Sequence, residues 1–264
     1  MLTSDMTSRD TSAALSLRGL SKAFGSTLAV DRLDLDVPRG SFFGFVGPNG
    51  AGKTTTLSMA TGLLRPDAGT AHVMGHDVWS DTVRAKQLVG ILPDGLRLFD
   101  RLTGFQLICY SGLLRGMDRS LVVERAHELL EALGLEEEGG TLVVDYSAGM
   151  TKKISLAGAL IHAPRLLVLD EPFEAVDPIS TSTIRQILAG YAESGGTVIL
   201  SSHVMDLVQR VCDRVAIVAG GQIRAVGTLN EVRSGMTLEE RFVELVGGRA
   251  DVGEGLAWLR SSSD

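Results

Sequence analysis

One short run of residues constrains this chain more than any other part of its sequence. It reads Gly47, Pro48, Asn49, Gly50, Ala51, Gly52, Lys53 and Thr54, which matches the phosphate-loop pattern G-x-x-x-x-G-K-[ST]. A nearly continuous apolar segment, residues 41–46, precedes the run, and a helical pattern follows it from about residue 53 to 61. A glycine-rich loop between a buried strand and a helix predicts a nucleoside triphosphate site in an α/β fold.

Each part of this loop has a physical reason. Glycines let backbone N–H groups turn inward around phosphate oxygens, and the following helix directs the positive end of its dipole at the anion. Lys53 is expected to reach the β- and γ-phosphates, and the Thr54 hydroxyl is expected to ligate Mg²⁺. Thr55 follows directly, and we include it in the expected nucleotide site.

A second candidate element lies far along the chain. Four apolar residues, 166–169, run directly into Asp170 and Glu171. This pattern predicts a buried strand that carries two carboxylates to the C-terminal edge of a parallel sheet, where open α/β folds bind their ligands. Asp170 is expected to hold Mg²⁺, and Glu171 to act as general base toward the attacking water.

The rest of the chain alternates between strand and helix patterns. We expect antiparallel strands around residues 15–17 and 33–37, a hairpin at 69–78, buried strands at 197–200 and 215–218, and a second hairpin from 215–218 into 222–226. Helical spacing marks residues 121–133 and 238–246, residues 136–140 read as a polar loop, and residues 97–163 look mainly helical. The predicted fold is an α/β P-loop NTPase with a mixed, mainly parallel sheet, an antiparallel β subdomain and an inserted helical subdomain.

Composition limits the possible functions. The chain has 264 residues, 44% of them apolar and 22% charged, which suits a globular protein with a buried core. Its net charge of −7 argues against phosphate-driven nucleic-acid binding. We see neither a signal peptide nor an apolar run long enough for a membrane span, so any role at a membrane is expected to come through a partner.

An ordered set of motifs points to one family. The phosphate loop comes first, and the acidic strand is the third motif. The other three motifs are Tyr146, Ser147, Ala148, Gly149 and Met150; then Val176, Asp177 and Pro178; and lastly Ser201, Ser202 and His203. With these motifs the chain resembles the ATP-binding cassette (ABC) ATPases over about residues 15–246. The expected division is a mobile tail at 1–12, an ABC ATPase domain at 13–246 with its helical subdomain at about 97–163, and a C-terminal tail at 247–264.

The resemblance implies that two ATPase domains pair head to tail and hold ATP between them. Ser147 and Gly149 would contact the γ-phosphate of ATP bound to the partner domain. This chain has one copy of each motif, so the resemblance implies a second ATPase subunit, expected in a homodimer, and a polytopic membrane permease. The expected location is cytoplasmic, at the periphery of the inner face of the cell membrane, and no nucleic acid is expected as a partner.

Further site residues follow from the same resemblance. His203 is similar to the switch histidine that touches the γ-phosphate. Phe24 stands at the position of the adenine-stacking aromatic, although packing within the β subdomain is the alternative. Asp177 resembles the acidic residue of the dimer-contact loop, with a plain helix N-cap as the alternative. His72, His76, His127 and His162 match no motif, and we expect no functional role for them.

The sequence also departs from the family pattern. Asp94 stands where a glutamine is usual, and it is expected to serve as a further Mg²⁺ ligand. The signature reads Tyr-Ser-Ala-Gly-Met, a variant that resembles a branch of ATPase subunits serving drug, antibiotic or polysaccharide exporters. Two alternatives stay open at this point. One is a member of the family that acts on nucleic acid or the ribosome, and the other is an ATP-binding switch with little turnover.

Overall fold

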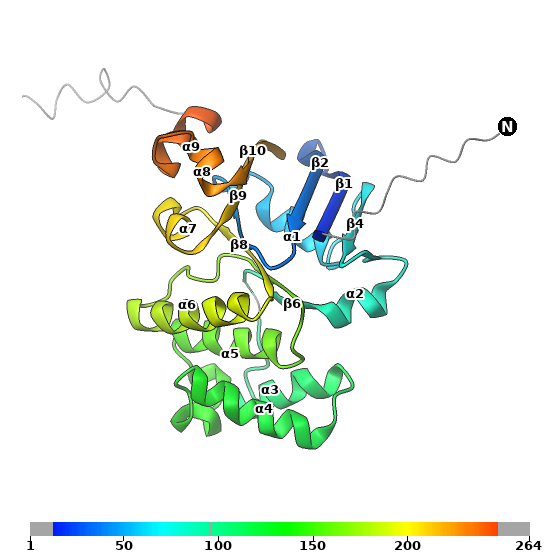
Figure 1. Ribbon diagram of the computed structural model, residues 1–264. Coiled ribbons are helices and arrows are strands. Elements are labelled where there is room, and N and C mark those ends of the chain that lie inside the picture. The colour runs from blue at the N-terminus through cyan, green and yellow to red at the C-terminus, as the bar shows by residue number, and fades with distance from the viewer. Residues whose placement is uncertain (1–12, 96, 248–264) are drawn as a thin grey trace, which may run out of the picture.

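Two sheets build the fold (Figure 1), seen in a computed structural model that describes residues 13–95 and 97–247. The strands of the larger sheet are β3 (Phe42–Val46), β6 (Val89–Leu92), β7 (Leu166–Leu169), β8 (Thr197–Ser202), β9 (Arg214–Ala219) and β10 (Gln222–Thr228). They lie in the order β10-β9-β3-β8-β7-β6, and every pair is parallel except β10 with β9. The four-stranded antiparallel sheet has the order β2-β1-β4-β5, from β1 (Ala13–Phe24), β2 (Thr27–Pro38), β4 (Ala68–Val73) and β5 (His76–Asp77). The predicted fold class is confirmed.

The helices fall into separate groups along the chain. Helix α1 (Lys53–Ala60) follows the phosphate loop, and α2 (Thr82–Leu88) leads into β6. Helices α3 (Gly104–Leu114), α4 (Arg119–Ala132) and α5 (Ala148–Leu160) fill most of the range predicted to be helical. Figure 1 shows α3 and α4 at the end of the molecule opposite the antiparallel sheet. After these come α6 (Pro178–Glu193), α7 (Met205–Val211), α8 (Leu229–Arg233) and α9 (Leu238–Val246).

Strand β3 separates two apolar cores. Phe43 and Phe45 are fully buried in the core that also holds Leu15 and Leu17 of β1, on the side of the antiparallel sheet. Phe42 and Val46, which alternate with them, belong to the core shared with the helices. Each buried large apolar side chain stabilises the fold by about 1.5–3 kcal/mol. Strand β3 is therefore held firmly from both faces, and the loop that follows it starts from a fixed point.

Two details of the sequence prediction are wrong. The segment expected to be a polar loop at residues 136–140 contains a short 3-10 helix, Glu137–Gly140. Helix α2 and strand β6 were not expected, and β6 extends the parallel sheet beyond β7. Gly90 explains why β6 is inconspicuous in sequence, because a Cβ there would lie 2.3 Å from the Ala159 carbonyl oxygen of α5.

The described range bears on two further predictions. The expected tails, residues 1–12 and 247–264, lie outside it apart from Gly247, so the division into domains stays a prediction. Within the described ranges, none of the helices combines the length and the apolar character needed to cross a membrane.

Candidate functional site

Close backbone packing explains two glycines of the phosphate loop. A Cβ on Gly47 would lie 2.4 Å from the carbonyl oxygen of Val218 on the adjacent strand β9. A Cβ on Gly52 would lie 2.4 Å from the carbonyl oxygen of Ala29, and Gly52 also has a φ of 97°. Gly52 is the N-cap of α1 and supplies no side-chain cap, so the first N–H groups of the helix have no side-chain partner from it. The loop therefore presents backbone donors to an anion.

Lys53 is almost fully buried, and its ammonium is surrounded by acceptors. Its Nζ donates to the Gly47 carbonyl oxygen at 2.9 Å and lies 3.4 Å from Glu171 Oε1. A buried charge needs such partners. Thr54 is exposed and Thr55 is half-buried at the start of the same helix.

Asp170 and Glu171 follow β7, as predicted, and a serine from the neighbouring strand holds them in place. Both side chains are buried. The Ser201 hydroxyl at the end of β8 donates to Asp170 Oδ1, and its oxygen accepts the Glu171 N–H at 2.9 Å. Ser201 belongs to the last of the five sequence motifs, but the sequence predicted no role for it. The only signal for such a role was its position at the end of a buried strand beside the acidic one.

His203 lies just beyond the same strand, with its side chain 41% exposed. Its Nδ1 is 3.1 Å from Glu171 Oε1, the oxygen that Lys53 also approaches. Neither approach has hydrogen-bond geometry, so this buried oxygen lacks an aligned donor, and the Lys53 ammonium attracts it electrostatically. The Glu171 carboxylate therefore lies close to both the Lys53 ammonium and the His203 imidazole.

Most of the predicted site residues line one pocket of about 470 Å³, a size that suits a small organic ligand. Its wall consists of Phe24, Ala29, Pro48, Asn49, Gly50, Ala51, Gly52, Lys53, Thr54, Thr55, Asp94, Glu171, Glu174 and His203. Ala29 and Glu174 were not predicted. Gly47 and Asp170 do not line the wall. The Gly47 carbonyl oxygen accepts a hydrogen bond from Lys53, and Asp170 accepts one from Ser201, whose hydroxyl oxygen also accepts the Glu171 N–H.

Phe24 ends strand β1 at the rim of this pocket. Phe24 is 52% exposed, and the Lys22 ammonium lies 5.8 Å from the centroid of its ring. An exposed aromatic face next to a cation can stack on a purine and attract the adjoining phosphates. Packing within the antiparallel sheet, the alternative considered from the sequence, leaves this much of the ring uncovered.

Asp94 occupies the turn after β6 and lines the pocket. Its Oδ1 is 4.0 Å from the Nζ of Lys152 on α5, and its side chain is 46% exposed. The pocket thus includes the carboxylates of Asp94, Glu171 and Glu174 together with the ammonium of Lys53.

The structure does not bring Ser147 and Gly149 to this pocket. Ser147 is exposed and caps α5, accepting the N–H of Met150 at 3.2 Å. Gly149 is buried, and a Cβ there would lie 2.7 Å from both Asp177 Oδ2 and Ser180 Oγ. The close approach of α5 and α6 therefore gives Gly149 a packing reason of its own.

Asp177 is the N-cap of α6, which is the alternative that the sequence left open. Its Oδ1 accepts the N–H groups of Ile179 at 3.0 Å and Ser180 at 2.9 Å. The hydrogen bond with the Ser180 side chain, followed by these backbone bonds, lowers the pKa of Asp177. This cap does not test a role for Asp177 in dimer contact.

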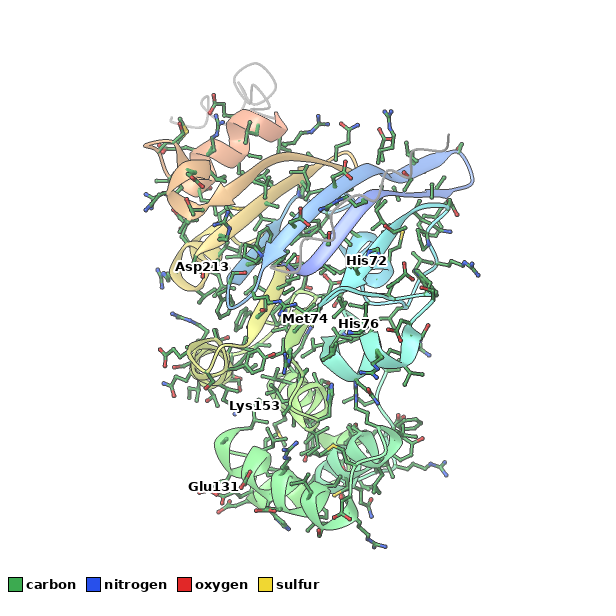
Figure 2. All side chains as sticks on the ribbon, turned by 45° about the vertical axis from the view of Figure 1, so that its right-hand side comes forward. His72, Met74, His76, Glu131, Lys153 and Asp213 are labelled. Atoms are coloured by element: carbon green, nitrogen blue, oxygen red, sulfur yellow. The ribbon has the colours of Figure 1, made fainter. Side chains whose placement is uncertain are left out.

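The unassigned histidines have local partners. His72 and His76 lie near each other on the β4–β5 hairpin (Figure 2), where His76 Nδ1 is 2.6 Å from Asp81 Oδ2. His162 is different, because its Nε2 lies 3.1 Å from the Val89 carbonyl oxygen while its buried Nδ1 has no partner. Burial is the main reason that the pKa of His162 falls from 6.5 to about 4.

Residues 30–174 match the model of a protein family described as ABC transporter. Over 223 residues the chain is 37% identical to the daunorubicin/doxorubicin resistance ATP-binding protein DrrA of Streptomyces peucetius, an alignment that covers 84% of this chain and 68% of that protein. It is 34% identical to the Nod factor export ATP-binding protein I of Cupriavidus metallidurans, with 83% and 73% covered. A solved structure of the ATP-binding subunit of an ABC transporter superposes with a TM-score of 0.82 at 26% identity, covering 88% of this chain and 99% of that one.

Proposed function

Given that this chain belongs to the ABC transporter family, as an ATPase of its exporter branch, we propose that it pairs with a second copy of itself and drives a separate membrane permease. The observation that carries the proposal is the single pocket shared by the phosphate loop, Glu171 and His203. The proposed location is the cytoplasmic periphery of the membrane, where the permease would hold it.

Within that pocket the proposed roles follow from chemistry and position. Lys53 and the loop N–H groups bind the β- and γ-phosphates, and Phe24 stacks on the adenine. Glu171 orients the attacking water and accepts its proton, because its carboxylate lies beside the Lys53 ammonium that marks the phosphate position. His203 lies beside the same carboxylate and contacts the γ-phosphate.

The residues present fit Mg²⁺, whose preferred ligands are oxygens. Thr54 supplies a hydroxyl at the pocket wall, and Asp170 keeps a second carboxylate oxygen beyond the one that Ser201 occupies. Asp94 supplies a carboxylate from the turn after β6. When bound, Mg²⁺ would neutralise charge that builds up on the phosphate oxygens. These three residues are the proposed protein ligands.

Two surfaces outside the pocket support the proposed assembly. The exposed Ser147 at the start of α5 does not line its own pocket, which suits contact with ATP held by a partner copy. Phe99, five residues after Asp94, is 58% exposed, and Val144 is 62% exposed; the Val144 N–H bonds the carbonyl oxygen of Asp100, the residue after Phe99. We assign this apolar surface to the permease. Coexpression with the permease should move the chain into the membrane fraction.

The decisive test of the catalytic assignment replaces Glu171 by glutamine. Glu171→Gln keeps the size of the side chain but removes the base, so kcat for ATP hydrolysis should fall about 100-fold or more. Glu128→Gln is the matched control, since Glu128 is an exposed glutamate of helix α4 that does not line this pocket; its kcat should stay near that of the wild type. Light scattering with ATP present should show the Glu171→Gln variant as a dimer. Wild-type turnover by Glu171→Gln would refute its role as base.

A further inference from the structure

The backbone at Glu171 has an unusual conformation for a residue with a side chain. Its φ is 46°, in the left-handed region that glycine favours. Such a conformation raises the free energy of the folded chain and persists only where the surroundings hold it. The same conformation sets the direction in which the carboxylate leaves the backbone, so whatever holds the peptide also positions the carboxylate.

Hydrogen bonds hold this residue at both its N–H and its carbonyl group. The N–H donates to Ser201 Oγ at 2.9 Å, and the carbonyl oxygen accepts the Glu174 N–H at 3.3 Å. The carbonyl oxygen also accepts a hydrogen bond from Lys152 Nζ at 3.0 Å. Ser201 and Glu174 belong to the sheet edge and to the turn that carry the site. Lys152 belongs to α5, the helix that starts at the Ser147 cap.

Lys152 also faces the carboxylate of the turn after β6. Its Nζ is 4.0 Å from Asp94 Oδ1, and the Lys152 side chain is only 19% exposed. Asp94 adds a negative charge to a pocket that already contains Glu171 and Glu174 and that must accept a polyphosphate. An ammonium at this point offsets part of that charge. The Lys152 side chain thus bonds the backbone of Glu171 and also offsets part of the negative charge of Asp94.

We propose that Lys152 is a positioning residue for Glu171, which it holds through the carbonyl oxygen. This inference rests on the role of Glu171 as general base. Lys152 follows Ser147 by little more than one helical turn, so a shift of the start of α5 moves the ammonium that anchors Glu171. Helix α5 is the helix proposed to contact the partner's nucleotide through Ser147. The Lys152 contact links this helix to Glu171, the general base of the chain's own site.

The test measures ATP hydrolysis by the full-length chain over a range of ATP concentrations. Lys152→Met removes the ammonium and keeps the length of the side chain, so kcat should fall about tenfold or more, since small displacements of a reacting group cost this much. KM should change less than about twofold, because Lys152 does not line the pocket, and the Asp94 carboxylate whose charge it offsets is 46% exposed, where solvent screens the interaction. Lys152→Arg should recover at least about half of the kcat. Lys86→Met, at an exposed lysine of α2, is the control and should match the wild type.

Several results would overturn the proposal. Wild-type kcat for Lys152→Met would show that the carbonyl contact does not position the base. Equal losses in Lys152→Met and Lys152→Arg, or a rise in KM that accounts for the loss, would indicate a structural or a binding role. Should Lys152→Met fail to fold, Lys152→Gln is held to the same kcat and KM criteria. Glu171→Gln, assayed in parallel, separates the two claims, because full turnover there refutes the base itself.

Discussion

Replacing Ser201 by alanine tests how the acidic strand end is held. The Ser201 side chain is fully buried, and its hydroxyl serves two partners at once, Asp170 and the Glu171 N–H. Losing a hydrogen bond to a charged group costs about 1.5–3 kcal/mol, and a buried N–H left without an acceptor costs about 1–3 kcal/mol. Because one hydroxyl makes both bonds, the two losses overlap, and we expect a net loss of about 3 kcal/mol.

That loss is large enough to measure by thermal unfolding. For a chain of this size, about 1 kcal/mol corresponds to roughly 2–4 °C, so Tm should fall by about 6–12 °C. The kcat for ATP hydrolysis should fall as well, since Glu171 loses one of its backbone anchors. Ser111→Ala is the control, because its hydroxyl donates only to the Leu107 carbonyl oxygen within α3, and its Tm should change by about 2 °C or less. A Ser201→Ala variant as stable as this control would refute the reasoning.

Two further predictions concern stability. Gly50 and Gly52 both have positive φ, but a Cβ on Gly50 meets open space. Gly50→Ala should therefore cost about 1 kcal/mol in urea unfolding and Gly52→Ala at least about twice that, and equal losses would contradict the packing argument. Burial, Arg115 and Arg125 hold the pKa of His162 at about 4 against 6.5 for an unperturbed ring. Its contribution to stability is thus complete above pH 6.5 and is lost as the pH falls toward 4. With partial exposure discounted, unfolding free energy should drop by about 1–2 kcal/mol between pH 7 and 5, and an equal drop in His162→Gln would refute this assignment.

The sequence was most informative where function and local structure impose the same residues. The phosphate loop needs glycines because Val218 and Ala29 approach it, and it needs a lysine directly after them. The strand before Asp170 needs four apolar residues because all four are buried. Such requirements act on neighbours in the chain, so a single sequence records them. The order of these elements then predicted the fold class.

Contacts between distant segments could not be predicted in this way. Strand β6 has only four residues, and one of them is a glycine whose requirement comes from α5 rather than from the strand itself. Ser201 and Lys152 are ordinary residue types at their positions, and only the folded chain places them on the N–H and the carbonyl of Glu171. No periodicity or spacing records a contact that joins positions so far apart in the sequence. Their roles therefore emerge only from the structure.

Helix α5 connects these contacts to the proposed assembly. Its first turn presents the exposed Ser147, and its second turn carries Lys152 to the Glu171 carbonyl oxygen. Along a helix these residues are about 7–8 Å apart, close enough to move as one rigid unit. A displacement of α5 by about 0.5 Å along this hydrogen bond would stretch it from 3.0 Å to about 3.5 Å, outside the usual range for N–H···O bonds. In the proposed dimer, contact between Ser147 and the partner's nucleotide would therefore change the position of Glu171, the general base of this chain's own pocket. Helix α5 alone would transmit this change, without a longer pathway through the core.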